Sequence, residues 1–149
     1  MKYFKEHEFS GWYDQLNPAL MVNLDELRHR WGMPIAISPV RGAVGRHKGE
    51  DNTSQHNVDK WGEVRAVDTL PWGIKTQEDA NRFYRLSRDC GFSGVGFYPQ
   101  WKPRPGFHLD VRVNSNLLYV ATWGQLNSEW INIQAAIAQL AENLKPENQ

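Results

Sequence analysis

The chain has 149 residues, which is the length of one ordinary domain and enough to bury a single core. Seventeen basic residues balance seventeen acidic residues, so the formal net charge is zero. This balance argues against a protein that binds nucleic acid or anionic membranes through a general basic surface.

The single cysteine, Cys90, excludes an internal disulfide and a thiolate zinc site, so any metal must be held by imidazole and carboxylate groups. The first eight residues contain no apolar run typical of a secretory signal, and no stretch approaches the roughly 20 apolar residues of a membrane span. We therefore expect one soluble domain over residues 1–149, made in a cytoplasm without a signal peptide.

Three segments have the pattern of helices. An Asn-Pro pair opens the first, over residues 17–32, and a Thr-x-x-Asp capping box opens the second, over residues 76–91. A glycine ends each of these two segments. The third helix is predicted to begin near residues 127–128 and to run through Leu144, with Trp130 on its apolar stripe.

Short β-prone runs separate these helices, at residues 35–37, 64–67, 95–98, 107–113 and 117–120. A helix precedes the first run and most of the others follow one another, which indicates an α+β fold with a mainly antiparallel sheet. Residues 41–57 show no periodicity. A structureless segment of about fifteen residues is uncommon in a compact domain, so we interpret it as a functional loop.

The run at 107–113 alternates between apolar and polar side chains. Its two faces carry Leu109, Val111 and Val113 on one side and His108, Asp110 and Arg112 on the other. We expect the apolar side to pack on the core. The polar side has two interpretations, an ordinary solvated sheet surface or a set of groups that take part in chemistry.

Two further polar residues complete a set that could bind a metal. His56 ends the polar loop, and Asp68 ends the β-prone run that follows it. With His108 they supply two imidazoles and one carboxylate, which leave a fourth position of a zinc ion open, as a catalytic site requires. The simpler alternative is that each is a hydrogen-bonding or capping residue.

Several short motifs occur in order along the chain. Residues 35–41 read IAISPVR, and residues 54–68 contain S-x-H, then a glycine, then A-V-D. Residues 94–99 read GVGFYP, residues 107–112 read FHLDVR, and residues 121–123 read ATW. Together these motifs resemble the M15 family of zinc peptidases, which includes D-Ala-D-Ala carboxypeptidases and the L-Ala-D-Glu endopeptidases of phage lysins.

The resemblance implies a Hedgehog- and DD-peptidase-like fold and a Zn²⁺ cofactor held by His56, Asp68 and His108. It also assigns Arg41 to the binding of the substrate peptide. The general base is left open, because the residues just before the last ligand supply no carboxylate or imidazole. Asp110 is the candidate, and the alternative is that Asp110 only orients a ligand histidine.

This chain differs from the family in the distance between its first two ligands. His56 and Asp68 lie twelve residues apart, farther than in the family, so residues 57–61 are interpreted as part of an insertion that loops out. Three loop tryptophans near the motifs could wall a groove for glycan or peptide, with ordinary packing as the alternative: Trp61, Trp72 and Trp101.

The function that the resemblance implies is zinc-dependent hydrolysis of a peptide bond in the stem peptide of bacterial peptidoglycan. The protein would be a phage lysin in the host cytoplasm or a virion component that penetrates the wall. Two other functions fit the same sequence. One is a non-catalytic zinc-containing domain that binds the cell wall, and the other is a metal-free phage structural protein on the same fold.

Overall fold

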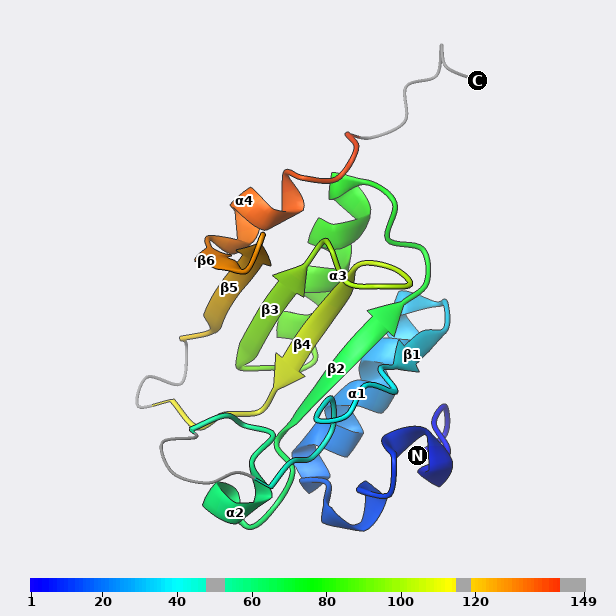
Figure 1. Cartoon of the computed structure of the whole chain (residues 1–149). Coiled ribbons are helices and arrows are strands. Elements are labelled where there is room, and N and C mark those ends of the chain that lie inside the picture. The colour runs from blue at the N-terminus through cyan, green and yellow to red at the C-terminus, as the bar shows by residue number, and fades with distance from the viewer. Residues whose placement is uncertain (48–52, 115–118, 143–149) are drawn as a thin grey trace.

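In the part of the chain that the structure describes, six strands form one sheet, and helices cover one of its faces (Figure 1). The computed structural model describes residues 1–47, 53–114 and 119–142. The strands are β1 (Ile35–Ile37), β2 (Ala66–Pro71), β3 (Gly94–Tyr98), β4 (Gly106–Asp110), β5 (Ala121–Leu126) and β6 (Glu129–Ile131). They follow the order β1-β2-β4-β3-β5-β6, and every neighbouring pair is antiparallel except β3 with β5. The predicted α+β fold with a mainly antiparallel sheet is confirmed.

The described residues also form four α-helices and two short 3₁₀ segments: η1 (Glu6–Phe9), η2 (Tyr13–Gln15), α1 (Pro18–Trp31), α2 (Val58–Trp61), α3 (Gln77–Asp89) and α4 (Ile133–Ile137). α1 and α3 confirm the first two predicted helices. The Asn17 side chain accepts two backbone N–H groups at the start of α1, and Thr76 and Asp79 form the predicted capping box of α3. Within the described residues, no helix is long and apolar enough to cross a membrane.

The predicted third helix is wrong over its first half. The chain there forms the antiparallel hairpin of β5 and β6, and α4 begins only after it. Asn127 and Ser128 have φ angles of 51° and 66°, the left-handed pair that a tight hairpin turn requires, so the chain reverses where a helix was expected to start. Trp130 therefore lies on β6 with 66% of its surface exposed, and not in the core.

Other boundaries also differ from the predictions. β2 begins two residues later than predicted and ends at Pro71, so Asp68 lies inside a strand and not at its end. β4 ends at Asp110, and Val113, which was expected to face the core, is 82% exposed. Of the predicted run 117–120, the first two residues lie outside the described ranges and the other two are irregular. Leu144, the predicted end of the third helix, also lies outside the described residues.

The core lies between the sheet and the helices α1 and α3. Phe107 of β4 is fully buried at its centre, with its ring centroid 4.6 Å from that of Phe83 on α3 and 4.7 Å from that of Phe97 on β3. Because side chains alternate along a strand, the residues next to Phe107 and Phe97 point to the opposite face of the sheet. That opposite face carries His108, Gly96 and Asp68, and it faces away from α1 and α3.

The core position of Phe107 and the exposed position of Val113 give a matched pair of expectations. Phe107→Ala should lower the free energy of unfolding by about 3–5 kcal/mol, because it removes a ring from between two others. Val113→Ala should change it by less than about 0.5 kcal/mol, although the sequence pattern placed Val113 on the same packed face. Urea denaturation of both variants measures the two values, and equal losses would contradict the boundary of β4.

Candidate metal centre

One row of residues crosses four strands of the open face. In the strand register, Asp68 of β2 lies opposite His108 of β4, His108 lies opposite Gly96 of β3, and Gly96 lies opposite Trp123 of β5. A Cβ atom at Gly96 would lie 2.4 Å from the Trp123 indole nitrogen. Glycine at this position therefore lets the Trp123 ring lie across β3, where its centroid is 5.1 Å from that of His108.

The third polar residue of the group, His56, comes from the loop before α2. Backbone hydrogen bonds hold this loop against the residue that precedes β2 and against its own earlier part: Arg65 N–H donates to the Gln55 carbonyl, and Arg46 N–H donates to the His56 carbonyl. The residues after His56 form α2, whose start the Asn57 side chain caps. Residues 57–61, which the family resemblance would make an insertion, thus contain one helical turn, and His56 and Asp68 lie side by side.

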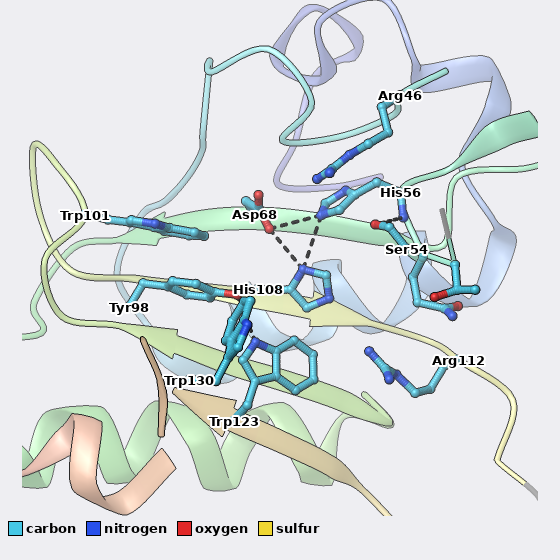
Figure 2. Close-up of a pocket in the computed structure, with 12 residues that line it drawn as sticks. Arg46, Ser54, His56, Asp68, Tyr98, Trp101, His108, Arg112, Trp123 and Trp130 are labelled. Carbon is cyan, nitrogen blue, oxygen red and sulfur yellow. Dashed lines mark hydrogen bonds and ion pairs between the residues drawn. The ribbon is translucent and has the colours of Figure 1, made fainter. Parts of the chain in front are cut away.

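The side chains of His56, Asp68 and His108 converge on one point (Figure 2). His56 Nε2 lies 3.2 Å from Asp68 Oδ1 and 3.2 Å from His108 Nδ1, and His108 Nδ1 lies 3.1 Å from Asp68 Oδ1. His56 and His108 are buried, and Asp68 is largely buried. The three ligands that the sequence predicted are thus brought together, and the group could hold a metal ion.

In each imidazole, one ring nitrogen points away from the point where the three side chains converge. The hydrogen bond that this outer nitrogen makes determines which ring nitrogen, the inner one, faces that point. His56 Nδ1 lies 2.6 Å from the Val44 carbonyl oxygen, and His108 Nε2 lies 2.7 Å from a carboxylate oxygen of Asp110. Both outer nitrogens must therefore carry the proton and donate, so in the neutral tautomers the inner nitrogens carry lone pairs. Two lone pairs and a carboxylate oxygen then meet within 3.2 Å, an arrangement that a proton on one imidazole or a bound metal ion would stabilise.

Asp110 lies behind His108 and is fully buried. One of its oxygens accepts from His108 Nε2, and both accept from the Arg112 guanidinium, at 2.9 Å from Nε and 2.6 Å from Nη2. Burial acts to raise the pKa of Asp110, but the hydrogen bonds from Arg112 and His108 hold that pKa well below its ordinary range. A Cβ atom at Gly94 would lie 2.2 Å from the carboxylate, so glycine at that position makes room for it.

These contacts favour the orienting role of Asp110 over the role of general base. Its carboxylate holds the side of the His108 imidazole that faces away from the ligand group, and it does not line the pocket in front of that group. A carboxylate in this position fixes the tautomer and the ring orientation of a metal-ligating histidine. Arg112, the other polar residue of the predicted strand face, is the ion-pair partner of Asp110.

Two carboxylates set the protonation of His108. Burial acts to lower the pKa of its imidazole, but the hydrogen bonds with Asp110 and Asp68 outweigh burial and raise the pKa to about 9. Burial likewise acts to raise the pKa of Asp68, and hydrogen bonds with His108 and His56 hold it well below the ordinary range. Without a metal, a proton on His108 is therefore the cation that the three converging atoms require.

A pocket of about 600 Å³ opens in front of the group (Figure 2). Its lining residues are Arg46, Thr53, Ser54, Gln55, His56, Asp68, Tyr98, Trp101, His108, Arg112, Trp123 and Trp130. Among the three loop tryptophans that were predicted to wall a groove, Trp101 lines this pocket, whereas Trp61 and Trp72 do not. In the described part of the chain, Asp68 is the only carboxylate in the lining.

The arginines that line the pocket are Arg46 and Arg112, and Arg41 is not among them. Arg41 is exposed and does not contribute to the lining. Arg46 Nη2 donates to the Gly42 carbonyl at 3.0 Å, and the buried Nε–H has no hydrogen-bond partner among the residues that the structure describes. Sequence reasoning missed Arg46 because the arginine motif ends five residues earlier; the signal that could have found it is its position in the same aperiodic loop as His56.

Tyr98 is a second pocket residue that the sequence did not single out as functional. Its hydroxyl accepts a hydrogen bond from the Trp123 indole N–H at 2.9 Å, which leaves the phenolic proton available to a ligand. Burial, together with the nearby Asp68 carboxylate, raises the pKa of Tyr98 to about 12, so the hydroxyl remains a donor at neutral pH. Its place in the GVGFYP motif, two residues after the glycine opposite His108, is the signal that could have identified it.

Comparison of this chain with protein-family models, with curated proteins and with solved structures finds no match. The chemical capacity of the site therefore follows from its own side chains. These are two imidazoles and a carboxylate that could hold a metal ion, beside an open pocket with cationic and hydrogen-bonding groups.

The raised pKa of His108 predicts how the stability of the metal-free protein depends on pH. A folded-state pKa of about 9 against an ordinary 6.5 means that the protonated imidazole stabilises the fold below about pH 6.5, and that this stabilisation is lost as pH rises toward 9. Zinc affinity should rise over the same window, because metal replaces the proton. Thermal unfolding of chelator-treated and zinc-loaded protein between about pH 6 and 9 should therefore show a growing difference in Tm.

His47 provides the control for this pH profile. Its side chain is 70% exposed and lies outside the pocket, so His47→Asn should leave the profile unchanged. A Tm of the metal-free protein that stays level or rises from about pH 6.5 to 9 would contradict the placement of His108 between two carboxylates.

The contacts of Asp110 predict the effect of Asp110→Asn. An amide cannot accept from both His108 and Arg112 as the carboxylate does, so zinc affinity should fall by about 10–100-fold. Excess zinc should then restore part of any activity. Glu63→Gln, which removes a partly exposed carboxylate paired with Arg65 outside the pocket, should leave zinc affinity unchanged.

A general base would behave differently in the same experiment. The variant would bind zinc normally, and kcat would fall by about 10²–10⁴-fold whatever the zinc concentration. Zinc titration and kcat measured on the same preparation of Asp110→Asn separate the two roles.

Proposed function

We propose that this protein is a zinc-dependent peptidase that hydrolyses a peptide bond of bacterial peptidoglycan. The observation that carries the proposal is the convergence of His56 Nε2, His108 Nδ1 and Asp68 Oδ1 at the floor of an open pocket. Two imidazoles and one carboxylate are a ligand set of catalytic zinc sites, where the fourth position is left for water or substrate.

The spacing of the three atoms supports a small tetrahedral ion. Zinc bonds of about 2.0–2.1 Å place neighbouring ligand atoms of a tetrahedron about 3.3–3.4 Å apart. The distances of 3.1–3.2 Å between the ligand atoms are close to this value. When bound, zinc would polarise a peptide carbonyl and make water acidic enough to act as a nucleophile near neutral pH.

The protein's own groups have separate tasks in this proposal. Asp110 holds His108 in the tautomer that presents Nδ1 to the pocket, and the Val44 carbonyl does the same for His56. Arg46 and Tyr98 bring a guanidinium and a phenolic O–H to the pocket, where they would bind the negative charge that develops on the carbonyl oxygen. No separate general base is assigned, because Asp68 is the one carboxylate in the described lining.

The choice of peptidoglycan as substrate is supported by the motifs that resemble the M15 peptidases. The ligands of those motifs are the three residues that converge here, and Tyr98, Asp110 and Trp123 of the same motifs surround them. We extend the proposal to a phage lysin or a virion component that acts on the host wall.

A second candidate is a non-catalytic zinc-containing domain that binds the cell wall. The observation that favours it is the absence of a second carboxylate from the described lining of the pocket. Such a domain would hold the metal and bind wall fragments without releasing peptides.

The test uses purified protein and purified cell walls. The protein should contain about one zinc per chain and should lower the turbidity of a wall suspension, with release of peptides that mass spectrometry identifies. His56→Ala should lose both zinc and activity, and His47→Ala should keep both, because His47 lies outside the pocket. A protein that retains zinc but releases nothing supports the second candidate, and full zinc content in His56→Ala refutes the metal site.

Arg46 and Arg41 form a matched pair for the substrate-binding role. Arg46→Lys should lower kcat/KM by about 10-fold or more with zinc content unchanged, because lysine cannot reproduce the forked geometry of a guanidinium toward a carbonyl or carboxylate. Arg41→Lys should have no effect, although the family resemblance assigns the role to that residue. The reverse result on released muropeptides would return the role to Arg41.

A further inference from the structure

One side of the pocket is built from aromatic rings, here called the aromatic wall: Tyr98, Trp101 and Trp130. The Tyr98 and Trp101 rings are stacked, with centroids 4.0 Å apart and an angle of 10° between their planes. The Trp130 ring stands on edge against Tyr98 at 6.4 Å and 80°. Figure 2 shows these residues together on one side of His108 and Asp68, with Arg46 and Arg112 on the other.

The exposure of Trp130 is unusual for a tryptophan inside a pocket lining. Its surface is 66% exposed, although it contributes to the pocket in front of the ligand group. Trp72 is the comparison: it is 51% exposed and lies outside this pocket, where the Arg104 guanidinium covers its ring at 3.8 Å. An exposed indole beside a pocket is apolar surface available to a ligand.

A glycine of β4 makes room for one ring of the aromatic wall. Tyr98 lies opposite Gly106 in the register of β3 and β4. A Cβ atom at Gly106 would lie 2.4 Å from the Trp101 ring, so this glycine lets the indole lie across β4 and stack on Tyr98. The sheet therefore positions the Tyr98 and Trp101 rings beside the ligand group.

Charge separates the two sides of the pocket. The aromatic wall has no ionised group, and the neighbouring Gln100 and Asn127 amides are bonded to each other. The two arginines of the lining, Arg46 and Arg112, lie on the other side. The uncharged side suits an uncharged, flat ligand group, and the cationic side suits a peptide that carries carboxylates.

Peptidoglycan contains one kind of group that matches the uncharged side. Its stem peptides consist mainly of small and charged residues, which offer no flat apolar surface. Its N-acetylated pyranose rings are neutral and present flat faces of C–H groups, which pack on aromatic faces. We propose that the aromatic wall binds a pyranose ring of the glycan strand. This inference rests on the proposed function, and it makes the sugar-proximal part of the stem peptide the substrate.

The position of the aromatic wall indicates which part of the stem peptide would reach the ligand group. Tyr98 and Trp101 line the same pocket as the ligand group, and Trp101 also borders a second pocket that shares Asp68. A sugar held on the wall would place the first bonds of its attached peptide at the ligand group. The bond at the far end of the stem peptide would lie beyond it.

The primary experiment measures saccharide binding directly. Isothermal titration of the full chain with a soluble β-1,4-linked N-acetylglucosamine tetramer should show saturable binding. Trp130→Ala should weaken that binding by about 10-fold or more, as expected for the loss of a central aromatic contact. Trp72→Ala is the matched control and should bind as the wild type does. No binding by the wild type, or equal affinity in Trp130→Ala and the wild type, overturns the inference.

A second arm separates this inference from the proposed function. On purified walls, Trp130→Ala should release peptide at least about 5-fold more slowly than the wild type, and the loss on a free stem peptide, which carries no sugar, should be smaller. Trp72→Ala, outside the pocket, should match the wild type on both substrates. Saccharide binding with no hydrolysis of either substrate would refute the peptidase and retain the sugar site. Hydrolysis of both substrates without saccharide binding, or cleavage only at the far end of the stem, would retain the peptidase and refute the sugar site.

Discussion

The structure depends on the meeting of two imidazole nitrogens and a carboxylate oxygen, which need a proton or a metal ion between them. His56 and His108 each use one ring nitrogen to donate outward, to the Val44 carbonyl and to Asp110, and this leaves their other nitrogens facing the Asp68 carboxylate. In water such groups would separate. Here the fold holds them within 3.2 Å of one another, and the free energy of that arrangement depends on a cation.

The sheet provides the positions that make this arrangement possible. A single row of the register carries Asp68, His108 and Trp123 on three different strands, and Gly96 occupies the fourth position. In the adjacent row Gly94 faces Asp110, the carboxylate that orients His108. Glycine weakens a strand, yet at both positions a larger side chain would occupy the space of a functional group.

The sequence predicted the parts of the fold that depend on local patterns. α1 and α3 have caps and apolar stripes that are legible in the chain, and His108 stands out because β4 alternates cleanly. The hairpin of β5 and β6 was mistaken for a helix, because Trp130 and Ile133 also fit a helical stripe and the turn depends on the left-handed conformations of Asn127 and Ser128. Of the aromatic wall, Trp101 was among the predicted groove residues. Arg46 and Trp130 were not predicted, since tertiary contacts bring Arg46 to the pocket from a segment without periodicity and Trp130 from a misassigned one.

Two residues of the ligand group come from strands and the third comes from a loop, and this difference has a thermodynamic consequence. Asp68 and His108 belong to adjacent strands and keep their positions with the sheet, whereas His56 belongs to the loop that also brings Arg46, Ser54 and Gln55 to the pocket. An ion shared by these residues would act as a cross-link between loop and sheet, and it would reduce the conformational entropy of the loop. Metal and substrate would then bind with positive cooperativity, each raising the affinity for the other by the same factor.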